Sequence, residues 1–195
     1  MSKLSSKFSQ RKPYSLTIQE IRDRAKEHIK RGAVTETYHG DLDQAVRVLN
    51  EALATELVCV LRYRSHYYNA DGILSQSVAG EFLEHSIEEW HHADRIAARI
   101  KQLDGKPDFN PATLLERSHA EFQEGATLVE MIEADLVAER IAIDSYRDVI
   151  RYFGENDPTS RRMMESILAS EEEHAEELSS LLMVIDPRRQ SDQAA

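Results

Sequence analysis

Residues 88–92 read Glu-Glu-Trp-His-His and lie within a long charged segment that also carries an apolar stripe. Inside this stretch Glu89 and His92 form a Glu-x-x-His pair. Side chains three residues apart lie on one face of a helix, with Cβ atoms roughly 5–6 Å apart, so one divalent ion can contact both. The same pair recurs at Glu171 and His174. The repeat predicts two helices that each present a metal-binding pair.

Two further glutamates, Glu56 and Glu139, precede the two pairs at nearly equal distances along the chain. Both occupy positions that helical periodicity assigns to the core, as in the series Leu53, Glu56 and Val60. A single glutamate there usually extends its head group to water, and a single histidine is usually a hydrogen-bonded core residue. Four carboxylates that converge in a core would repel one another without a cation, because each buried charge costs several kcal/mol.

The pattern therefore predicts one buried dinuclear centre, in which two divalent cations neutralise four carboxylates. Oxygen-rich ligation with one imidazole per metal favours iron or manganese over zinc. We expect two iron ions per subunit, with manganese as the alternative. The predicted ligands are Glu56, Glu89, His92, Glu139, Glu171 and His174.

The composition fits a helical protein of one main domain. The chain has 195 residues, 41% hydrophobic and 30% charged, with only seven Gly and five Pro. Cys59 is the only cysteine, which excludes an internal disulfide framework and any Cys-x-x-Cys zinc or rubredoxin-type site. No apolar run is long enough for a membrane span, and the N-terminus lacks a secretory apolar segment. We therefore expect a cytoplasmic protein without membrane contacts.

Capping and breaking signals divide the chain into an all-α arrangement. We expect a basic tail and short helix over residues 1–40, a four-helix bundle over 41–186, and a tail over 187–195. Thr17 with Glu20 opens the short helix, which Gly32 should close. The expected long helices cover residues 42–70, 75–104, 127–153 and 158–185. A long link, residues 105–126, joins the second and third of them. Within this link Pro111 starts a short helix that Gly125 interrupts. The order of short, long and short links is the ferritin-like connectivity.

These residues resemble the ferritin-like di-iron carboxylate proteins, and bacterioferritins most of all. Residues 49–58, 89–95 and 161–165 are similar to bacterioferritin in detail. The resemblance implies that Glu56 and Glu139 are terminal ligands. It implies that Glu89 and Glu171 bridge the two metals and that His92 and His174 are terminal. It also places Tyr63 beside the centre, as a catalytic tyrosine that hydrogen-bonds a ligand or gives up an electron.

The chain departs from bacterioferritin in three respects. The methionine that holds haem in that family is replaced by Trp90, so we expect no haem. Too few residues follow Ile185 for the short fifth helix of twenty-four-subunit cages. The extra N-terminal helix and the longer central link are similar to the Dps-like mini-ferritins, which form twelve-subunit cages. The resemblance thus implies a bacterioferritin-type site in a Dps-like protein, with a 12-mer favoured over a 24-mer.

We therefore expect a ferroxidase that oxidises Fe(II) with O2 or H2O2 for iron storage and oxidative-stress protection. A peroxide-detoxifying enzyme with iron or manganese uses the same residues and stays open. A Dps-type assembly protein that protects DNA is a third reading, although residues 1–13 hold few basic side chains and an assembly arm is favoured. Among nearby residues, we expect Cys59 to be a buried inert thiol, and His85 to support a ligand or receive incoming iron. Asp135 would orient a ligand or lie at the rim of the core.

Overall fold

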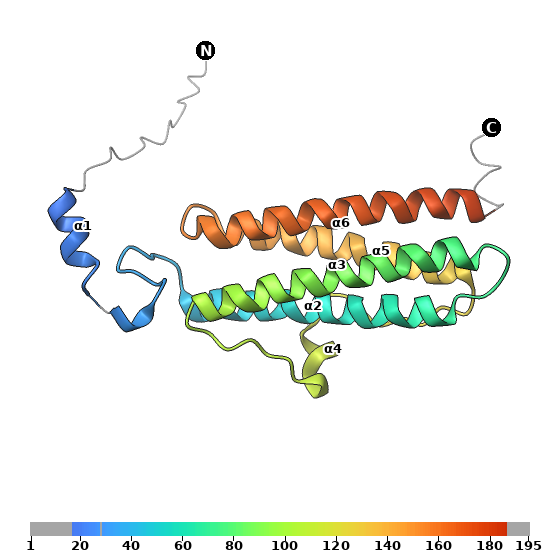
Figure 1. Cartoon of the computed structure of the whole chain (residues 1–195), viewed down its shortest axis with the longest axis horizontal. Helices are drawn as coiled ribbons and strands as arrows, with labels where there is room; N and C mark the ends of the chain where they lie inside the picture. The colour runs from blue at the N-terminus through green and yellow to red at the C-terminus, as the bar shows by residue number, and fades with distance from the viewer. Residues whose placement is uncertain (1–16, 28, 187–195) are drawn as a thin grey trace, which may run out of the picture.

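The computed structural model describes residues 17–27 and 29–186, and within those ranges it contains helices and no strand. Four long helices dominate (Figure 1) and confirm the all-α prediction. The predicted bounds hold to within one or two residues. The long helices are α2 Leu42–Asn69, α3 Ser75–Gln102, α5 Leu128–Phe153 and α6 Pro158–Ile185.

Local capping explains where these helices begin and end. The Asp41 side chain accepts a hydrogen bond from the backbone N–H of Gln44 at 3.0 Å and caps α2. Thr127 and Glu130 form a capping box at the start of α5. Asp157 caps α6, which has a proline at its first position. Gly154 ends α5 with φ of 45°, a left-handed conformation that favours glycine.

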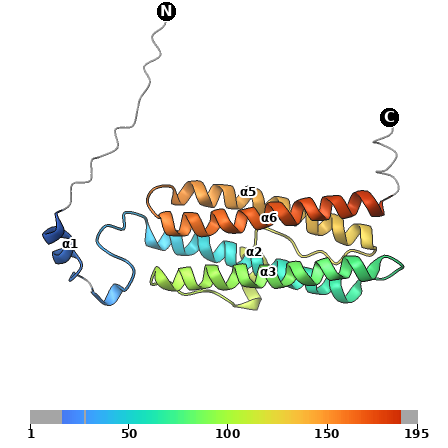
Figure 2. The ribbon, with the colours of Figure 1, turned by 45° about the horizontal axis from the view of Figure 1, so that its top comes forward.

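The four helices are arranged as two hairpins. The helix α2 packs along α3, and α5 packs along α6. Between the hairpins the chain travels the length of the bundle, so that α3 and α5 run in the same direction (Figure 1). Figure 2 shows the same two pairs from another side. This is the predicted ferritin-like connectivity of short, long and short links.

The long crossover, residues 103–127, follows the outside of α2. It contains a 3-10 turn, η2 Pro111–Thr113, and one helical turn, α4 Leu114–Arg117. The predicted short helix therefore begins at Pro111, but it ends well before Gly125 because Ser118 is extended. Gly105 lies near the start of the crossover, where an added Cβ would lie 2.5 Å from Cγ2 of Val46. Only glycine allows this close approach to α2 without displacing a neighbour.

The N-terminal helix is shorter than the sequence indicates. The helix α1 Ile18–Arg24 begins at the predicted capping box of Thr17 and Glu20 but ends before Gly32. A separate 3-10 turn, η1 Ile29–Arg31, follows it. Neither element buries a residue, so no packing extends α1 to the expected length. The tails at 1–13 and 187–195, with the predicted DNA contact, lie outside the described residues, and the domain boundaries stay predictions.

The apolar core is divided into two clusters. One includes Leu53, Ile96 and Tyr146, and the other includes Tyr63, Phe82 and Leu178. The charged stripe positions of the four helices lie between them. The polar centre is therefore enclosed along the bundle axis by packed side chains on both sides.

Candidate metal centre

The six predicted ligands meet in the middle of the bundle. Each long helix contributes, and none of the six residues is more than 4% exposed. Helix α2 supplies one glutamate, α5 supplies one, and α3 and α6 each supply a Glu-x-x-His pair. By helix order they are Glu56, Glu89 with His92, Glu139, and Glu171 with His174.

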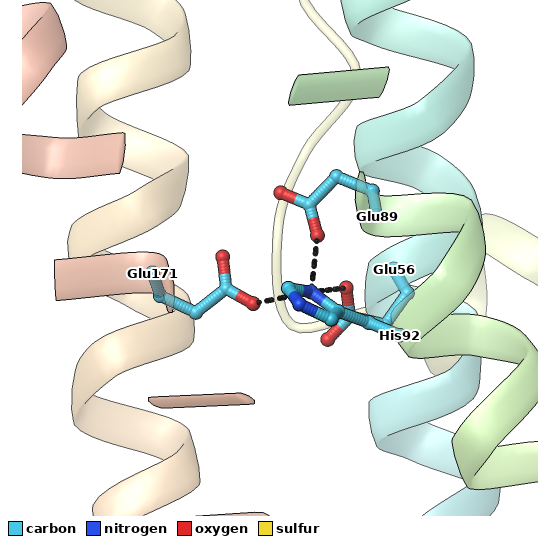
Figure 3. Close-up of side chains that lie close together, drawn as sticks. All are labelled: Glu56, Glu89, His92 and Glu171. Carbon is cyan, nitrogen blue, oxygen red and sulfur yellow. Dashed lines mark hydrogen bonds and ion pairs between the residues drawn. The ribbon is translucent and has the colours of Figure 1, made fainter. Parts of the chain in front are cut away.

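One half of the centre surrounds the imidazole of His92 (Figure 3). Its Nδ1 lies 3.1 Å from Oε1 of Glu171 and 3.2 Å from Oε2 of Glu89. Oε2 of Glu56 is 3.5 Å away. Ligand atoms from these four residues all lie within 4.8 Å of one another. One cation can therefore contact all four.

The second half has the same composition around His174. Ligand atoms of Glu89, Glu139, Glu171 and His174 also lie within 4.8 Å of one another. Nδ1 of His174 is 3.5 Å from Oε1 of Glu89 and 3.6 Å from Oε2 of Glu171. Glu89 and Glu171 thus turn one oxygen toward each histidine. This is the arrangement that two bridging carboxylates require, with Glu56 and Glu139 at the outer ends.

Several buried atoms of the centre have no hydrogen-bond partner. They are Oε1 of Glu89, Oε2 of Glu139, both carboxylate oxygens of Glu171, and Nδ1 of His174. Leaving buried polar atoms unpaired costs about 1–3 kcal/mol each, and more for charged groups. Because all of them belong to the two four-residue groups, two divalent cations would satisfy them together. The donor set fits iron or manganese.

The pKa shifts of the proposed ligands indicate how the carboxylates remain close together without a cation. Burial, followed by the charges of Glu171 and Glu89, raises the pKa of Glu56 well above its usual range. Burial also raises the pKa of Glu139, and the charge of Glu89 is the second largest cause of this rise. Burial would lower the pKa of His174, but the nearby carboxylates of Glu171 and Glu89 raise it to about 12. The metal-free centre is therefore stabilised by bound protons, which metal must displace.

Two tyrosines connect the hairpins across the centre. The hydroxyl of Tyr63 on α2 donates to Oε1 of Glu139 on α5. The hydroxyl of Tyr146 on α5 donates to Oε1 of Glu56 on α2 at 2.5 Å. Tyr63 therefore lies beside the centre, where the sequence places it. Sequence reasoning did not assign Tyr146 a role. The usable signal was that Tyr146 follows Glu139 by seven residues, as Tyr63 follows Glu56.

Two residues contact the outer side of His174. Oε2 of Glu88 lies 2.6 Å from Nε2 of the imidazole. This contact leaves Nδ1 free to face the centre, as is typical of metal-binding histidines. His85 stacks on the same ring, with centroids 4.0 Å apart. Helical periodicity does not single out Glu88, because this residue lies off the apolar stripe.

Both interpretations of Asp135 are wrong. Asp135 is fully buried, not at the rim, and its carboxylate bonds Arg62 and His66 and not a predicted ligand. It accepts a hydrogen bond from Nε of Arg62 at 2.7 Å and lies 2.7 Å from Nδ1 of His66. Arg62 also donates to the carbonyl of Glu121, and His66 contacts the carbonyl of Gln123. This buried cluster ties the crossover to the bundle.

Cys59 lies beside that cluster. Its side chain is 2% exposed, and its sulfur accepts a hydrogen bond from Nη2 of Arg62 at 3.4 Å. Burial raises the pKa of the thiol well above its usual range. A thiol held in the neutral form is a weak nucleophile.

Four carboxylates and two imidazoles at the middle of a four-helix bundle with one long crossover are the donor set that dinuclear-site bundle proteins use. The chain belongs to the ferritin-like family, whose ferritin-like domain matches residues 46–186. A bacterioferritin of Mycobacterium tuberculosis is 32% identical over 148 residues, which cover 75% of this chain and 88% of the relative.

Solved structures agree with this assignment. The bacterioferritin-related protein from Bacteroides fragilis, described as a dodecameric thioferritin, superposes with a TM-score of 0.73. It is 30% identical, and the match covers 78% of this chain and 92% of that one. Dps from Thermosynechococcus elongatus has a TM-score of 0.69 at 22% identity, covering 72% of this chain and 90% of that one, and shares the fold. None of the described helices is long and apolar enough to cross a membrane.

Proposed function

We propose that the chain is a ferroxidase that binds two Fe(II) ions at the six buried residues and oxidises them for storage in a cage. The observation that carries this proposal is that Glu89 and Glu171 each direct one oxygen toward either histidine. Two ions held by shared carboxylates can give up one electron each to the same oxidant molecule. Membership in the ferritin-like family and the similarity to bacterioferritins support the assignment.

The overall reaction balances with either oxidant. Two Fe(II) yield two Fe(III) and two electrons, which convert O2 and two protons to H2O2, or H2O2 and two protons to two waters. The four carboxylates favour the higher charge of Fe(III) over Fe(II). Glu56 and Glu139 would be terminal ligands. Each is held in place by a tyrosine hydroxyl from the opposite hairpin, Tyr146 and Tyr63.

The packed core on both sides limits access of water to the centre. Tyr63 lies within hydrogen-bond distance of a proposed ligand, and a phenol there can supply an electron when the two ions provide too few. We propose no haem for this chain, because Trp90, which is 48% exposed, occupies the position of the methionine that holds haem in bacterioferritins. The dodecameric description of the Bacteroides fragilis protein supports a twelve-subunit cage.

The test is an anaerobic Fe(II) titration followed by addition of O2 or H2O2, with particle mass measured on the same sample. Glu89→Ala and His174→Ala should reduce the rate of Fe(II) oxidation to that of protein-free buffer, while helical content stays unchanged. Glu176→Gln, an exposed change on the same helix as His174, should leave the rate unchanged. Wild-type kinetics in both centre variants would refute the proposal. Faster oxidation by H2O2 than by O2 would favour the peroxide-consuming reaction at the same centre.

A further inference from the structure

A pocket lies at the surface where the C-terminal part of α3 meets the first turns of α6, at the end of the bundle that Figure 1 shows on the left. Its volume is about 630 Å³. Helix α3 contributes one arginine, and α6 contributes a second arginine, two hydroxyl side chains and two apolar ones. The lining residues are Arg95, Pro158, Thr159, Arg162, Met163 and Ser166. Among the described residues no acidic side chain lines this pocket, although the chain as a whole has a net charge of −11.

The two arginines bring positive charge to the same place without a counter-charge. Arg95 extends from α3 to the backbone of α6, where its Nη2 lies 3.5 Å from the carbonyl oxygen of Met163, the residue next to Arg162. Both arginines are exposed, and neither forms an ion pair within residues 17–27 and 29–186. Like charges held near each other repel, and an anion that contacts both removes this repulsion.

A buried contact one turn away fixes the two walls of the pocket relative to each other. Arg99 follows Arg95 by four residues on α3 and is only 9% exposed. Its Nε donates to Oγ of Ser160 at 2.8 Å, and its Nη2 donates to Oδ1 of Asp157 at 2.8 Å. Asp157 also caps α6. The start of α6 is therefore tied to α3, so the helices need not move for one anion to contact both walls.

The polar side chains that line the pocket suit phosphate. Thr159, Arg162 and Ser166 are three and four residues apart and therefore share one face of α6. A guanidinium carries five N–H donors in a planar fork that matches two oxygens of a phosphate group. Because phosphate presents its oxygens in several directions, it can accept hydrogen bonds from both walls at once. A metal cation does not fit this pocket, since no carboxylate of the described residues lines it.

We propose that Arg95 and Arg162 bind inorganic phosphate between α3 and α6. Thr159 and Ser166 supply hydroxyl donors to the same ion. Arg95 follows His92 by three residues on α3, so the bound anion lies about one helical turn from the His92 half of the centre along this helix. The site does not rest on the proposed ferroxidase function, because it requires neither iron nor an oxidant.

The experiment measures the binding of inorganic phosphate to the assembled, metal-free protein by equilibrium dialysis at physiological salt. Wild-type protein is compared with Arg95→Gln, Arg162→Gln and Arg140→Gln. The matched control is Arg140→Gln, because Arg140 is also an exposed arginine but lies on α5, outside the pocket. We expect one phosphate per subunit in wild-type protein and in this control. Each of the other two variants should bind phosphate about tenfold or more weakly, because each loses charge-assisted hydrogen bonds.

Three results would overturn the proposal. The first is the absence of saturable phosphate binding to wild-type protein, which would mean that the arginines are covered or paired within the assembly. The second is unchanged binding in both Arg95→Gln and Arg162→Gln. The third is an equal loss in Arg140→Gln, which would mean general attraction to positive charge. Because no iron is present, none of these results depends on whether the centre oxidises Fe(II).

Discussion

Removing one partner of the buried ion pair Arg62–Asp135 should destabilise the protein strongly, because the other charge is left buried. Both side chains are fully buried, and Nε of Arg62 lies 2.7 Å from Oδ1 of Asp135. In Asp135→Leu the guanidinium would keep only the carbonyl of Glu121 and the sulfur of Cys59 as partners. An uncompensated buried charge costs about 3–5 kcal/mol. We expect a loss of that size in the free energy of unfolding.

Urea unfolding at a fixed subunit concentration measures this loss, because the stability of an assembly depends on concentration. The double variant Arg62→Met/Asp135→Leu removes both charges and should be much closer to wild type than Asp135→Leu. The matched control is the exposed pair Arg147–Glu172, which has the same 2.7 Å separation. Its loss in Glu172→Ala should cost at most about 1 kcal/mol. The reasoning is refuted if Asp135→Leu costs no more than Glu172→Ala.

Three further predictions address the centre and the crossover. Tyr63→Phe and Tyr146→Phe should each weaken Co(II) binding by roughly tenfold or more, because each removes a hydrogen bond that orients a proposed ligand; unchanged dissociation constants would contradict this. Metal binding should release protons and weaken as pH falls, because the metal-free centre retains protons and the pKa of His174 is about 12. Calorimetry in buffers of different ionisation enthalpy measures the number of protons released, and proton uptake on metal binding would contradict this prediction. Gly105→Ala should cost about 1–3 kcal/mol through its clash with α2, whereas Gly80→Ala, which meets no atom within 4 Å, should stabilise α3 by about 0.5–1 kcal/mol; equal effects in urea unfolding would count against the clash.

The fold was predictable because its signals are local. A capping box at Thr127, an N-cap with proline at Asp157 and a breaker at Gly154 act within one helical turn, and their effects do not depend on the rest of the chain. The composition of the centre was predictable for a related reason. Helical periodicity places Glu56 and Glu139 on core stripes, and four buried carboxylates have few alternatives to a metal.

The remaining contacts depend on how the hairpins dock. Tyr63 lies on the same stripe as Glu56, yet it bonds Glu139 on another helix, because side chains of facing helices interleave. Arg62 and His66 lie beside that stripe, so nothing in the periodicity of α2 indicates that they meet Asp135. The early end of α1 also depends on tertiary contacts, since a short helix without a packed face is marginal.

The division of the centre between two hairpins has a consequence for how the molecule forms. Helices α2 and α3 are neighbours in sequence, as are α5 and α6, so each hairpin is built from local contacts that form quickly. Every four-residue donor group, however, takes residues from both hairpins. Docking of the two hairpins therefore brings four acidic groups together, and their mutual repulsion opposes the docking. Metal ions bound by the proposed ligands would therefore also hold the two hairpins together.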